Sequence, residues 1–400
     1  MEQPLIIIIP LVGAVIGALL MAFTFRMMRH RTAIGALLGA GGGAAGSLLF
    51  MVPLNFCMFE ADRKSIDFVF GVALIAIGMA IVLGPLAWFV NQRTEKSIAT
   101  KDAAHQPQGM FKGWLIPAFL LSPTLVVLAL FLYYPTLDNF RLATLLTRLG
   151  APRTRFVCLD NFTSLATDPS YIQSILTTFA ISFAIIVLGL SIALFIAMMA
   201  YQPIRGARIY RTLLVWPYSL SPAVVGVIFL LMFSPIAGVI NYVIESLFGF
   251  KVPWLNDPTY APWTVILAAV WNHLGFNILF YIAGLQNVPT DLQESAAIDG
   301  ANAWQRFRHV IFPLLSPITF FLIITNLTYS FFDIFATIDM LTRGGPVNST
   351  TTLIYRIFQT GVQERDLGKA AAQSIVLLVM VIGITVLQFR TTGRRVNYGA

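Results

Sequence analysis

Charged residues are scarce in this 400-residue sequence. Asp, Glu, Lys and Arg together make up 11% of it, whereas hydrophobic residues make up 57%. An ordinary soluble domain carries roughly 25% charged residues. The composition therefore argues against a soluble protein and indicates an all-α integral membrane protein.

Motifs for nucleotide hydrolysis and metal binding are missing. No G-x-x-x-x-G-K-[ST] run occurs, and the four histidines form no H-x-x-x-H pair. No paired carboxylates and no nucleophile with a neighbouring base stand together, which argues against a membrane-embedded enzyme. The net charge of +8 comes from basic residues scattered in short loops, which argues against nucleic-acid binding. We expect no catalytic residue, no metal and no cofactor in this chain.

Long apolar runs fill most of the sequence. A membrane-spanning helix needs about 20 mostly apolar residues, because every backbone polar group in hydrocarbon must be satisfied within its own helix. We predict nine such spans, at residues 4–25, 33–59, 66–90, 114–135, 174–200, 212–233, 261–285, 314–337 and 370–389.

Basic residues predict the orientation of these spans. The first span follows Met1, Glu2 and Gln3 without a positive side chain, while Arg26 and Arg29 come just after it. Since positive residues flank the cytoplasmic ends of spans, we expect a retained anchor with the N-terminus outside and, after nine spans, the C-terminus inside.

Cysteine is almost absent. Cys57 and Cys158 are the two cysteines of the chain, too few for a disulfide framework. The predicted topology puts both near the outer face, where a bridge can form. We expect two unrelated thiols rather than a bridge.

A polar run divides the chain. Residues 91–113 contain Pro and Gly and show no helical apolar period, which is typical of a linker, here a cytoplasmic one. It separates a three-span extension, residues 1–90, from a six-span unit, residues 114–400. In the extension, glycines at four-residue spacing would let another helix approach closely: Gly35, Gly39 and Gly43. We favour the alternative, a small-residue helix that merely packs, because Gly is common in such spans.

One predicted cytoplasmic loop, residues 286–313, has an unusual pattern. Its sequence ESAAIDGANAWQRFRHVIFP begins at Glu294 and ends at Pro313. Glu294, Ala297, Ile298 and Ala301 share a helical face, and Gly300 interrupts the helix. A basic and aromatic piece follows. We predict two short helices that expose Trp304, Phe307 and Ile311 to a cytoplasmic partner; the alternative is an amphipathic loop lying on lipid headgroups.

The same residues resemble a known family. E-S-A-A-I-D-G, nine residues and V-I-F-P resemble the E-A-A-x-x-x-G-x(9)-I-x-L-P loop of ABC importer permeases, with departures at Ser295, Val310 and Phe312. The resemblance covers residues 114–396 and includes VCLDNF at 157–162 and GGPVNSTTTLIY at 344–355. It is closest to the carbohydrate-uptake permeases of the maltose and glycerol 3-phosphate type, and among these to the A-type glycerol 3-phosphate permeases.

The resemblance implies a fold, partners and a docking site. It implies a six-helix type I permease core, preceded here by three extra spans. It implies a second permease subunit of similar fold, two ATPase subunits that hold ATP and Mg, and an extracytoplasmic solute-binding protein. The loop would be the coupling helix that enters a cleft of the ATPase, with Glu294 making a charge contact and Gly300 the turn. The docking residues so implied are Glu294, Ala297, Gly300, Trp304 and Phe307.

Polar residues within the spans indicate a path for cargo. Such residues usually face a bundle interior or a water-filled cavity. One stripe holds Asn326, Tyr329 and Asp333, and a second holds His273, Asn277 and Tyr281. Amides and aromatic rings suit a polyhydroxylated ligand. The alternative is hydrogen bonding between helices.

The cargo class follows from the same stripes. The core spans contain no Lys or Arg to meet a phosphate, and Asp333 would repel one. We expect a carbohydrate or polyol derivative, such as a sugar, a glycosylated osmolyte or glycerol 3-phosphate, the last needing a cation from a partner subunit. A second reading is an ion-coupled secondary transporter with Asp333 or His273 as proton site; it leaves the loop unexplained.

Overall fold

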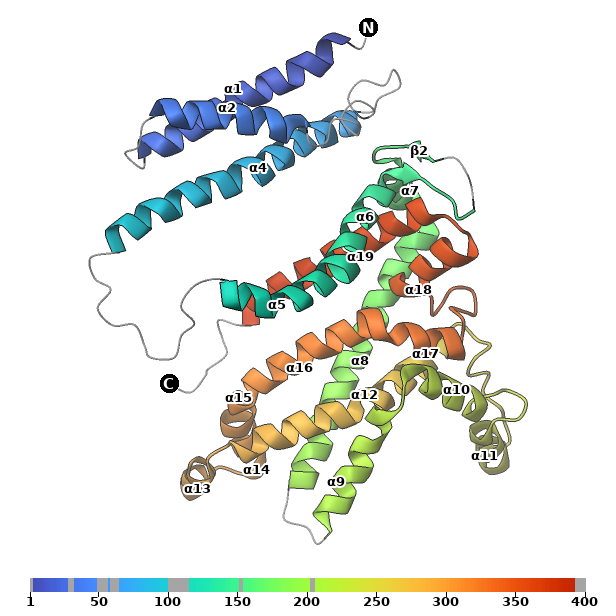
Figure 1. The fold of residues 1–400 in the computed structure, drawn as a ribbon. Helices are drawn as coiled ribbons and strands as arrows, with labels where there is room; N and C mark the ends of the chain where they lie inside the picture. Colours follow the sequence, from blue (N-terminus) through green and yellow to red (C-terminus); the bar gives the residue numbers. More distant parts are fainter. Residues whose placement is uncertain are drawn as a thin grey trace. The chain divides into compact units, whose positions relative to one another are not determined.

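The computed structural model describes most of the chain as helix (Figure 1). The described residues are 3–27, 32–48, 57, 65–99, 115–150, 154–201 and 206–392. They form two compact units, Met1–Ser164 with Asp366–Ala372, and Leu165–Arg365 with Gln373–Ala400.

The first unit begins with three apolar helices, α1 (Gln3–Met27), α2 (Thr32–Leu48) and α4 (Ser65–Ala99). Helices α1 and α2 lie side by side (Figure 1). A Cβ on Gly43 would collide with the backbone of Gly13, and one on Gly39 would collide with that of Gly17. The close approach of another helix to the glycine stripe, the less favoured alternative, is confirmed, because only glycine lets these two backbones touch.

The remainder of the first unit leads to a short hairpin. Helix α5 (Leu115–Leu128) continues through a π turn into α6 (Tyr134–Ala143), and β1 (Leu145–Leu146) pairs antiparallel with β2 (Arg155–Phe156). Asn161, in α7 (Asp160–Thr167), donates from Nδ2 to the carbonyl oxygens of Ala143 at 2.8 Å and Leu145 at 3.0 Å. The Asn of the VCLDNF motif therefore fixes α7 to the end of α6.

The two cysteines are joined in this unit. Cys57 and Cys158 form a disulfide with a Cα–Cα distance of 5.6 Å. The expectation of two unrelated thiols was wrong. The spacing of 101 residues hid the pairing, because the fold, and not the sequence, brings the turn before α7 against Cys57.

The second unit contains the remaining long helices. It runs through α8 (Pro169–Tyr201), α9 (Ala207–Val215), α10 (Pro222–Met232), α11 (Val239–Phe248), α12 (Ala261–Gln286), α13 (Thr290–Ile298), α14 (Ala303–Arg306), α15 (Phe312–Leu314), α16 (Ser316–Thr328), α17 (Ile334–Leu341), α18 (Leu353–Phe358) and most of α19 (Leu367–Thr392). Helix α12 lies at its centre and packs against α8, α10 and α16. Two apolar clusters form around it, one with Val265 and Ala269 and one with Ile278 and Leu285.

Within the described residues, six helices are long and apolar enough to cross a membrane: Ser65–Pro85, Phe119–Ala143, Pro169–Tyr201, Ala261–Gln286, Ser316–Leu341 and Leu367–Arg390. A bent pair makes a seventh if it is one span. Two further predicted spans correspond to α1, which is apolar over Ile9–Phe25, and to α2, which ends at Leu48; residues 49–56 and 58–59 of the second lie outside the described part.

The predicted span at 212–233 is divided into two helices. Ile209–Ser219 and Pro222–Met232 meet at 97°. Pro217 lies in a single 3-10 turn, Trp216–Ser219, and Pro222 begins α10 after Ser221, whose side chain accepts from the Val224 N–H at 3.4 Å. Proline has no N–H for a continuous helix, so two prolines this close break the span.

The polar run at 91–113 begins as helix, because α4 continues to Ala99. Residues 100–114 lie outside the described part. The two compact units divide at Ser164 and not at this run, so the first unit also holds α5, α6 and most of α7. The division into 1–90, 91–113 and 114–400 stays a prediction.

Candidate functional site

The loop between α12 and α16 folds as two short helices. Helix α13 ends at Ile298, and Gly300 follows with φ of 83°. The N–H of Ala301 donates to the carbonyl of Ala296 at 2.9 Å, which closes the end of α13. A positive φ is the conformation that glycine adopts without strain. The predicted break at Gly300 is confirmed.

A capping box begins the second helix of the loop. Asn302 Oδ1 accepts from the Gln305 N–H, and Gln305 Oε1 accepts from the Asn302 N–H, each at 2.8 Å. This pair satisfies two backbone donors at the start of α14. The N-A-W-Q spacing is the sequence signal of this capping box.

The loop exposes some of the predicted docking residues and covers others. Glu294, Ala297 and Gly300 are exposed, and Trp304 is 65% exposed. Phe307 is half-buried, with its ring stacked on Trp304 at 5.4 Å between centroids. The expectation that Phe307 and Ile311 are exposed was wrong. The ring of Phe307 is partly covered by Trp304, and Ile311 packs against the core around α12.

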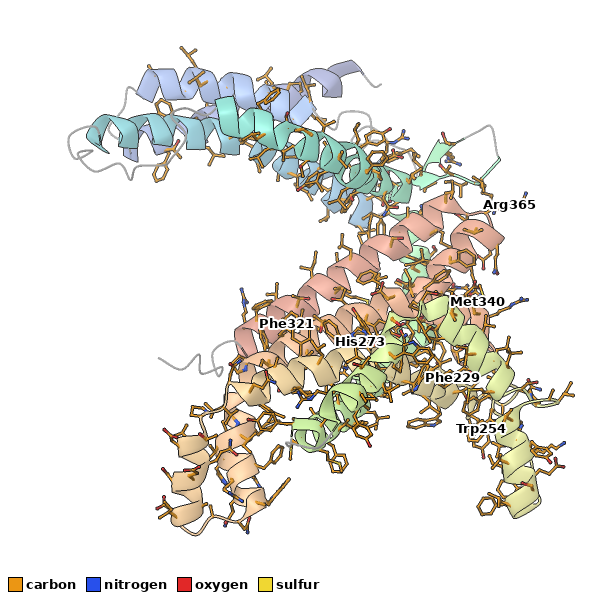
Figure 2. The ribbon with its side chains drawn as sticks, turned by 60° about the horizontal axis from the view of Figure 1, so that its bottom comes forward. Phe229, Trp254, His273, Phe321, Met340 and Arg365 are labelled. Carbon is orange, nitrogen blue, oxygen red and sulfur yellow. A yellow bond between two sulfur atoms is a disulfide. The ribbon has the colours of Figure 1, made fainter. Side chains whose placement is uncertain are left out.

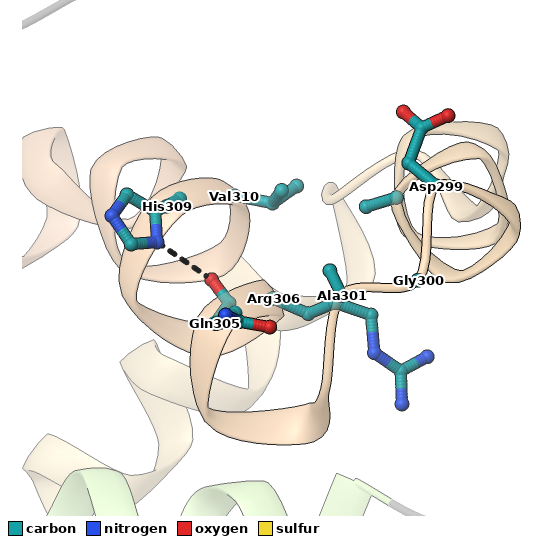
Figure 3. Close-up of a pocket in the computed structure, with 8 residues that line it drawn as sticks. Asp299, Gly300, Ala301, Gln305, Arg306, His309 and Val310 are labelled. Carbon is teal, nitrogen blue, oxygen red and sulfur yellow. Dashed lines mark hydrogen bonds between the residues drawn. The ribbon is translucent and has the colours of Figure 1, made fainter.

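A hollow of about 360 Å³ lies between the two helices of the loop (Figure 3). In the figure, Gly300 and Ala301 lie on the segment that connects the two helices. His309 Nδ1 lies 3.1 Å from the Gln305 carbonyl oxygen. Of the described lining residues, Arg306 has a buried Nε without a hydrogen-bond partner. The guanidinium of Arg306 can donate hydrogen bonds to an oxygen of a docked protein.

A second cavity, about 520 Å³, lies beside the broken helix. Its lining gathers three of the predicted path residues, His273, Tyr329 and Asp333, with the residues Tyr218, Leu220, Pro222, Asn272, Phe332, Phe335 and Ala336. The ring of Tyr329 stacks on that of His273 at 4.3 Å. Asp333 is exposed at this cavity, whereas His273 is buried. His273 lies among the helices of the second unit (Figure 2).

Asn272 holds this cavity together. Its Nδ2 donates to the carbonyl oxygens of Pro217 at 3.1 Å and Leu220 at 3.2 Å, and its Oδ1 accepts from Tyr329 Oη at 3.3 Å. It therefore joins the carbonyl groups at the break between α9 and α10 to the side chain of Tyr329. The role of Asn272 was not predicted, because its partners lie 52 to 57 residues away in the sequence.

His273, which lines the cavity, has one ring nitrogen without a hydrogen-bond partner within the described residues. The side chain is 8% exposed, and its Nε2 has no hydrogen-bond partner within the described residues. Tyr218 contacts the ring edge-on at 5.6 Å. Buried polar atoms are normally paired, so this nitrogen is an exception among the residues that line the cavity.

The other three predicted path residues do not line this cavity. Asn277 Nδ2 donates to Asn326 Oδ1 at 3.0 Å, and Asn326 Nδ2 donates to Asn277 Oδ1 at 2.7 Å. These amides are 1% and 0% exposed, and they join α12 to α16. Tyr281 is 1% exposed in the apolar cluster around Ile278. In this structure all three lie in contacts between helices.

A π turn at Tyr329–Asp333 separates the members of the predicted stripe. The stripe assumed a regular helix from Asn326 to Asp333. A π turn inserts a residue and changes the direction of later side chains, so Asn326 faces α12 while Asp333 is exposed.

The GGPVNSTTTLIY motif folds as a closed loop. Thr350 Oγ1 donates to the Gly345 carbonyl at 2.8 Å, and Thr351 Oγ1 donates to that of Gly344 at 2.9 Å. Gly344 has φ of 78°, and a Cβ there would lie 2.6 Å from Thr351 Oγ1. The motif therefore has a structural role before α18.

Comparison with known proteins agrees with this architecture. Residues 189–391 match the family model "Binding-protein-dependent transport system inner membrane component". The chain is 41% identical over 300 residues to the sn-glycerol-3-phosphate transport system permease protein UgpA of Yersinia pseudotuberculosis, covering 72% of this chain and 98% of the relative. It is 38% identical over 288 residues to UgpA of Brucella suis, with the same coverage.

A solved structure shares the fold. A chain of the bacterial alginate ABC transporter, in complex with an alginate pentasaccharide-bound periplasmic protein, superposes with a TM-score of 0.63 at 23% identity, over 72% of this chain and 96% of that one. At this identity the similarity shows the fold alone. The chain belongs to the binding-protein-dependent inner-membrane components, the permeases of ABC importers, and is a multi-pass protein of the bacterial inner membrane.

Proposed function

We propose that this permease carries a carbohydrate or polyol derivative into the cytoplasm, driven by ATP hydrolysis on partner subunits. The observation that carries the proposal is the exposed two-helix loop with its break at Gly300, in a chain of this family. Such a rigid, capped protrusion transmits motion better than a flexible loop, since its helices are fixed locally.

The subunit composition follows from the docking role. We infer a second permease of similar fold, two ATPase subunits that bind ATP and Mg, and an extracytoplasmic solute-binding protein. The alginate transporter of similar fold is named with a periplasmic protein, which supports the last partner. In this arrangement Glu294 meets a basic residue of the ATPase, and Trp304 is inserted with Phe307 stacked beneath it.

The orientation completes the proposal. The N-terminus lies outside and the loop at 286–313 lies in the cytoplasm, with the C-terminus. Residues 1–90 form an extension, residues 91–113 a cytoplasmic linker and residues 114–400 the permease. Support comes from basic residues after the first span and in the loop, since positive residues stay on the cytoplasmic side.

The cavity beside the broken helix is the proposed cargo contact. Of the described residues lining it, none is Lys or Arg, and Asp333 is the one carboxylate. Aromatic rings and the free His273 Nε2 suit hydroxyl groups and sugar faces. A phosphate monoester, the cargo in the name of the Yersinia relative, would meet a cation from the second permease.

Ligand-stimulated ATP hydrolysis tests this function. The complex is purified with its neighbouring subunits, placed in lipid and assayed with sugars, polyols and glycerol phosphates added with the binding protein. We expect one ligand class to stimulate hydrolysis and Glu294→Lys to abolish the stimulation while the subunits still assemble.

A matched substitution separates docking from charge. Glu245→Lys makes the same charge change on α11, where Glu245 is 49% exposed, and should leave stimulation unchanged. Unchanged stimulation in Glu294→Lys would contradict the docking role. Stimulation by none of the ligands would contradict the cargo class.

A further inference from the structure

The pair Cys57 and Cys158 has a consequence beyond transport. Cys57 lies between α2 and α4, and Cys158 lies in the turn between β2 and α7. Their Cα atoms are 5.6 Å apart. Cys57 is 1% exposed and Cys158 is 6% exposed. This separation falls in the range that a disulfide needs without backbone movement.

Cys158 occupies a conformation that disfavours cysteine. Its φ is 47°, in the left-handed region where a side chain costs free energy and glycine does not. A residue without a required side chain at this turn would best be glycine. The side chain of Cys158 therefore has a backbone cost that glycine would avoid.

The turn that holds Cys158 is itself anchored. The Val157 N–H donates to the Thr144 carbonyl at 2.9 Å, and the Asp160 N–H donates to the Val157 carbonyl at 2.9 Å. Asn161 ties the following helix to the end of α6. A bond to Cys158 is thus a bond to a fixed point on the permease.

The extension otherwise has one covalent connection to the permease, the chain through residues 91–113. The disulfide, between cysteines 101 residues apart in the sequence, adds a second covalent connection. It lies at the opposite end of α4 from the linker, because Cys57 precedes that helix and the linker follows it.

We propose that Cys57 and Cys158 are a site of oxidative modification that locks the three-helix extension to the end of α6 on the extracytoplasmic side. The two thiols lose two protons and two electrons to a protein disulfide of that compartment, which becomes a dithiol, and one S–S bond forms in this chain. The proposal rests on the proposed orientation but not on the cargo.

Cleavage of the linker tests the lock. A protease site is inserted within residues 101–110 of the full chain, and membrane vesicles are treated with N-ethylmaleimide before solubilisation. After cleavage we expect the two fragments to migrate as one species without reductant and to separate with it. In Cys57→Ser they should separate in both cases. Separation of the wild-type fragments without reductant would overturn the proposal.

The sidedness of cleavage tests the orientation separately. In inverted vesicles the linker should be cut, whereas right-side-out vesicles should protect it. The reverse pattern would overturn the oxidation of these thiols on the extracytoplasmic side, even if the bridge is present.

A matched pair of substitutions tests the strained turn. Cys158→Gly and Cys158→Ala both remove the bridge, but glycine fits the positive φ and alanine does not. We expect both to release the extension after cleavage, and Cys158→Ala to show the lower unfolding temperature. Retention of the extension in Cys158→Gly without reductant would show that packing alone holds it and would overturn the lock.

Discussion

The loop at 290–314 and the cavity beside α12 are both polar parts of an apolar chain, but they are built differently. In the loop, polar groups are satisfied within a few residues, as in the pair of Asn302 and Gln305. Around the cavity they are satisfied across long separations, 57 residues between Asn272 and Tyr329 and 49 between Asn277 and Asn326. Local construction makes an autonomous protrusion, whereas long-range construction makes a cavity that depends on the whole unit.

The largest effect should come from breaking the long-range amide pair. Asn326→Leu removes three hydrogen bonds of one buried side chain and leaves the Asn277 amide unpaired. An unsatisfied buried polar group costs about 1–3 kcal/mol. We expect a loss of about 2 kcal/mol, measured as a lower unfolding temperature in detergent.

Two further variants sharpen this result. Asn287→Leu, at an exposed asparagine whose Nδ2 donates to the Ala283 carbonyl, should change stability by less than about 0.5 kcal/mol. The double variant Asn277→Leu/Asn326→Leu should recover part of the loss, because no amide is left unpaired. A loss of stability in the double variant that exceeds the summed losses of the two single variants would contradict the reciprocal pair.

The next effect is local to the loop. In Gly300→Ala, no described atom lies within 4 Å of the added Cβ, so the cost is that of the positive φ alone, roughly 1–2 kcal/mol. We expect cargo-stimulated ATP hydrolysis to fall several-fold, with a smaller drop in the unfolding temperature of the permease than Asn326→Leu gives. Gly383→Ala, also open at its Cβ but within α19, is the control and should keep full coupling.

The same contrast explains what could be predicted from the sequence. Gly300 and the helix break were predictable, because the signal lies within a few residues. The stripe from Asn326 to Asp333 was predicted with a regular helix, and the π turn at Tyr329–Asp333 divided it. The roles of Asn272 and the cysteine pair depend on residues 57 and 101 positions away, and neither has a local pattern. The spans were predicted by length, except where two prolines bend one by 97°.

A smaller effect should follow from removing the loop's cap. Asn302→Ala loses the side-chain acceptor for the Gln305 N–H, which costs about 1 kcal/mol at a helix start. Because the loop is built locally, we expect faster hydrogen exchange of amides in α14 and no change in α12 or α16. Faster exchange in α12 as well would show that the loop and the cavity share one cooperative unit.

The smallest expected effect tests the cavity without breaking its frame. Tyr329→Phe removes the hydroxyl that donates to Asn272 at 3.3 Å and keeps the ring that stacks on His273. A net hydrogen bond contributes about 1 kcal/mol or less, and Asn272 keeps both bonds to the broken span. Stability should therefore fall only slightly.

If the cavity receives cargo, the ligand concentration for half-maximal ATP hydrolysis in Tyr329→Phe should rise several-fold, because Tyr329 lines the cavity beside the unpaired His273 nitrogen. Phe331→Leu, at a buried side chain two residues away that is not among the lining residues, should lower stability and leave that concentration unchanged. The opposite pattern would make the cavity a packing feature and place the cargo elsewhere.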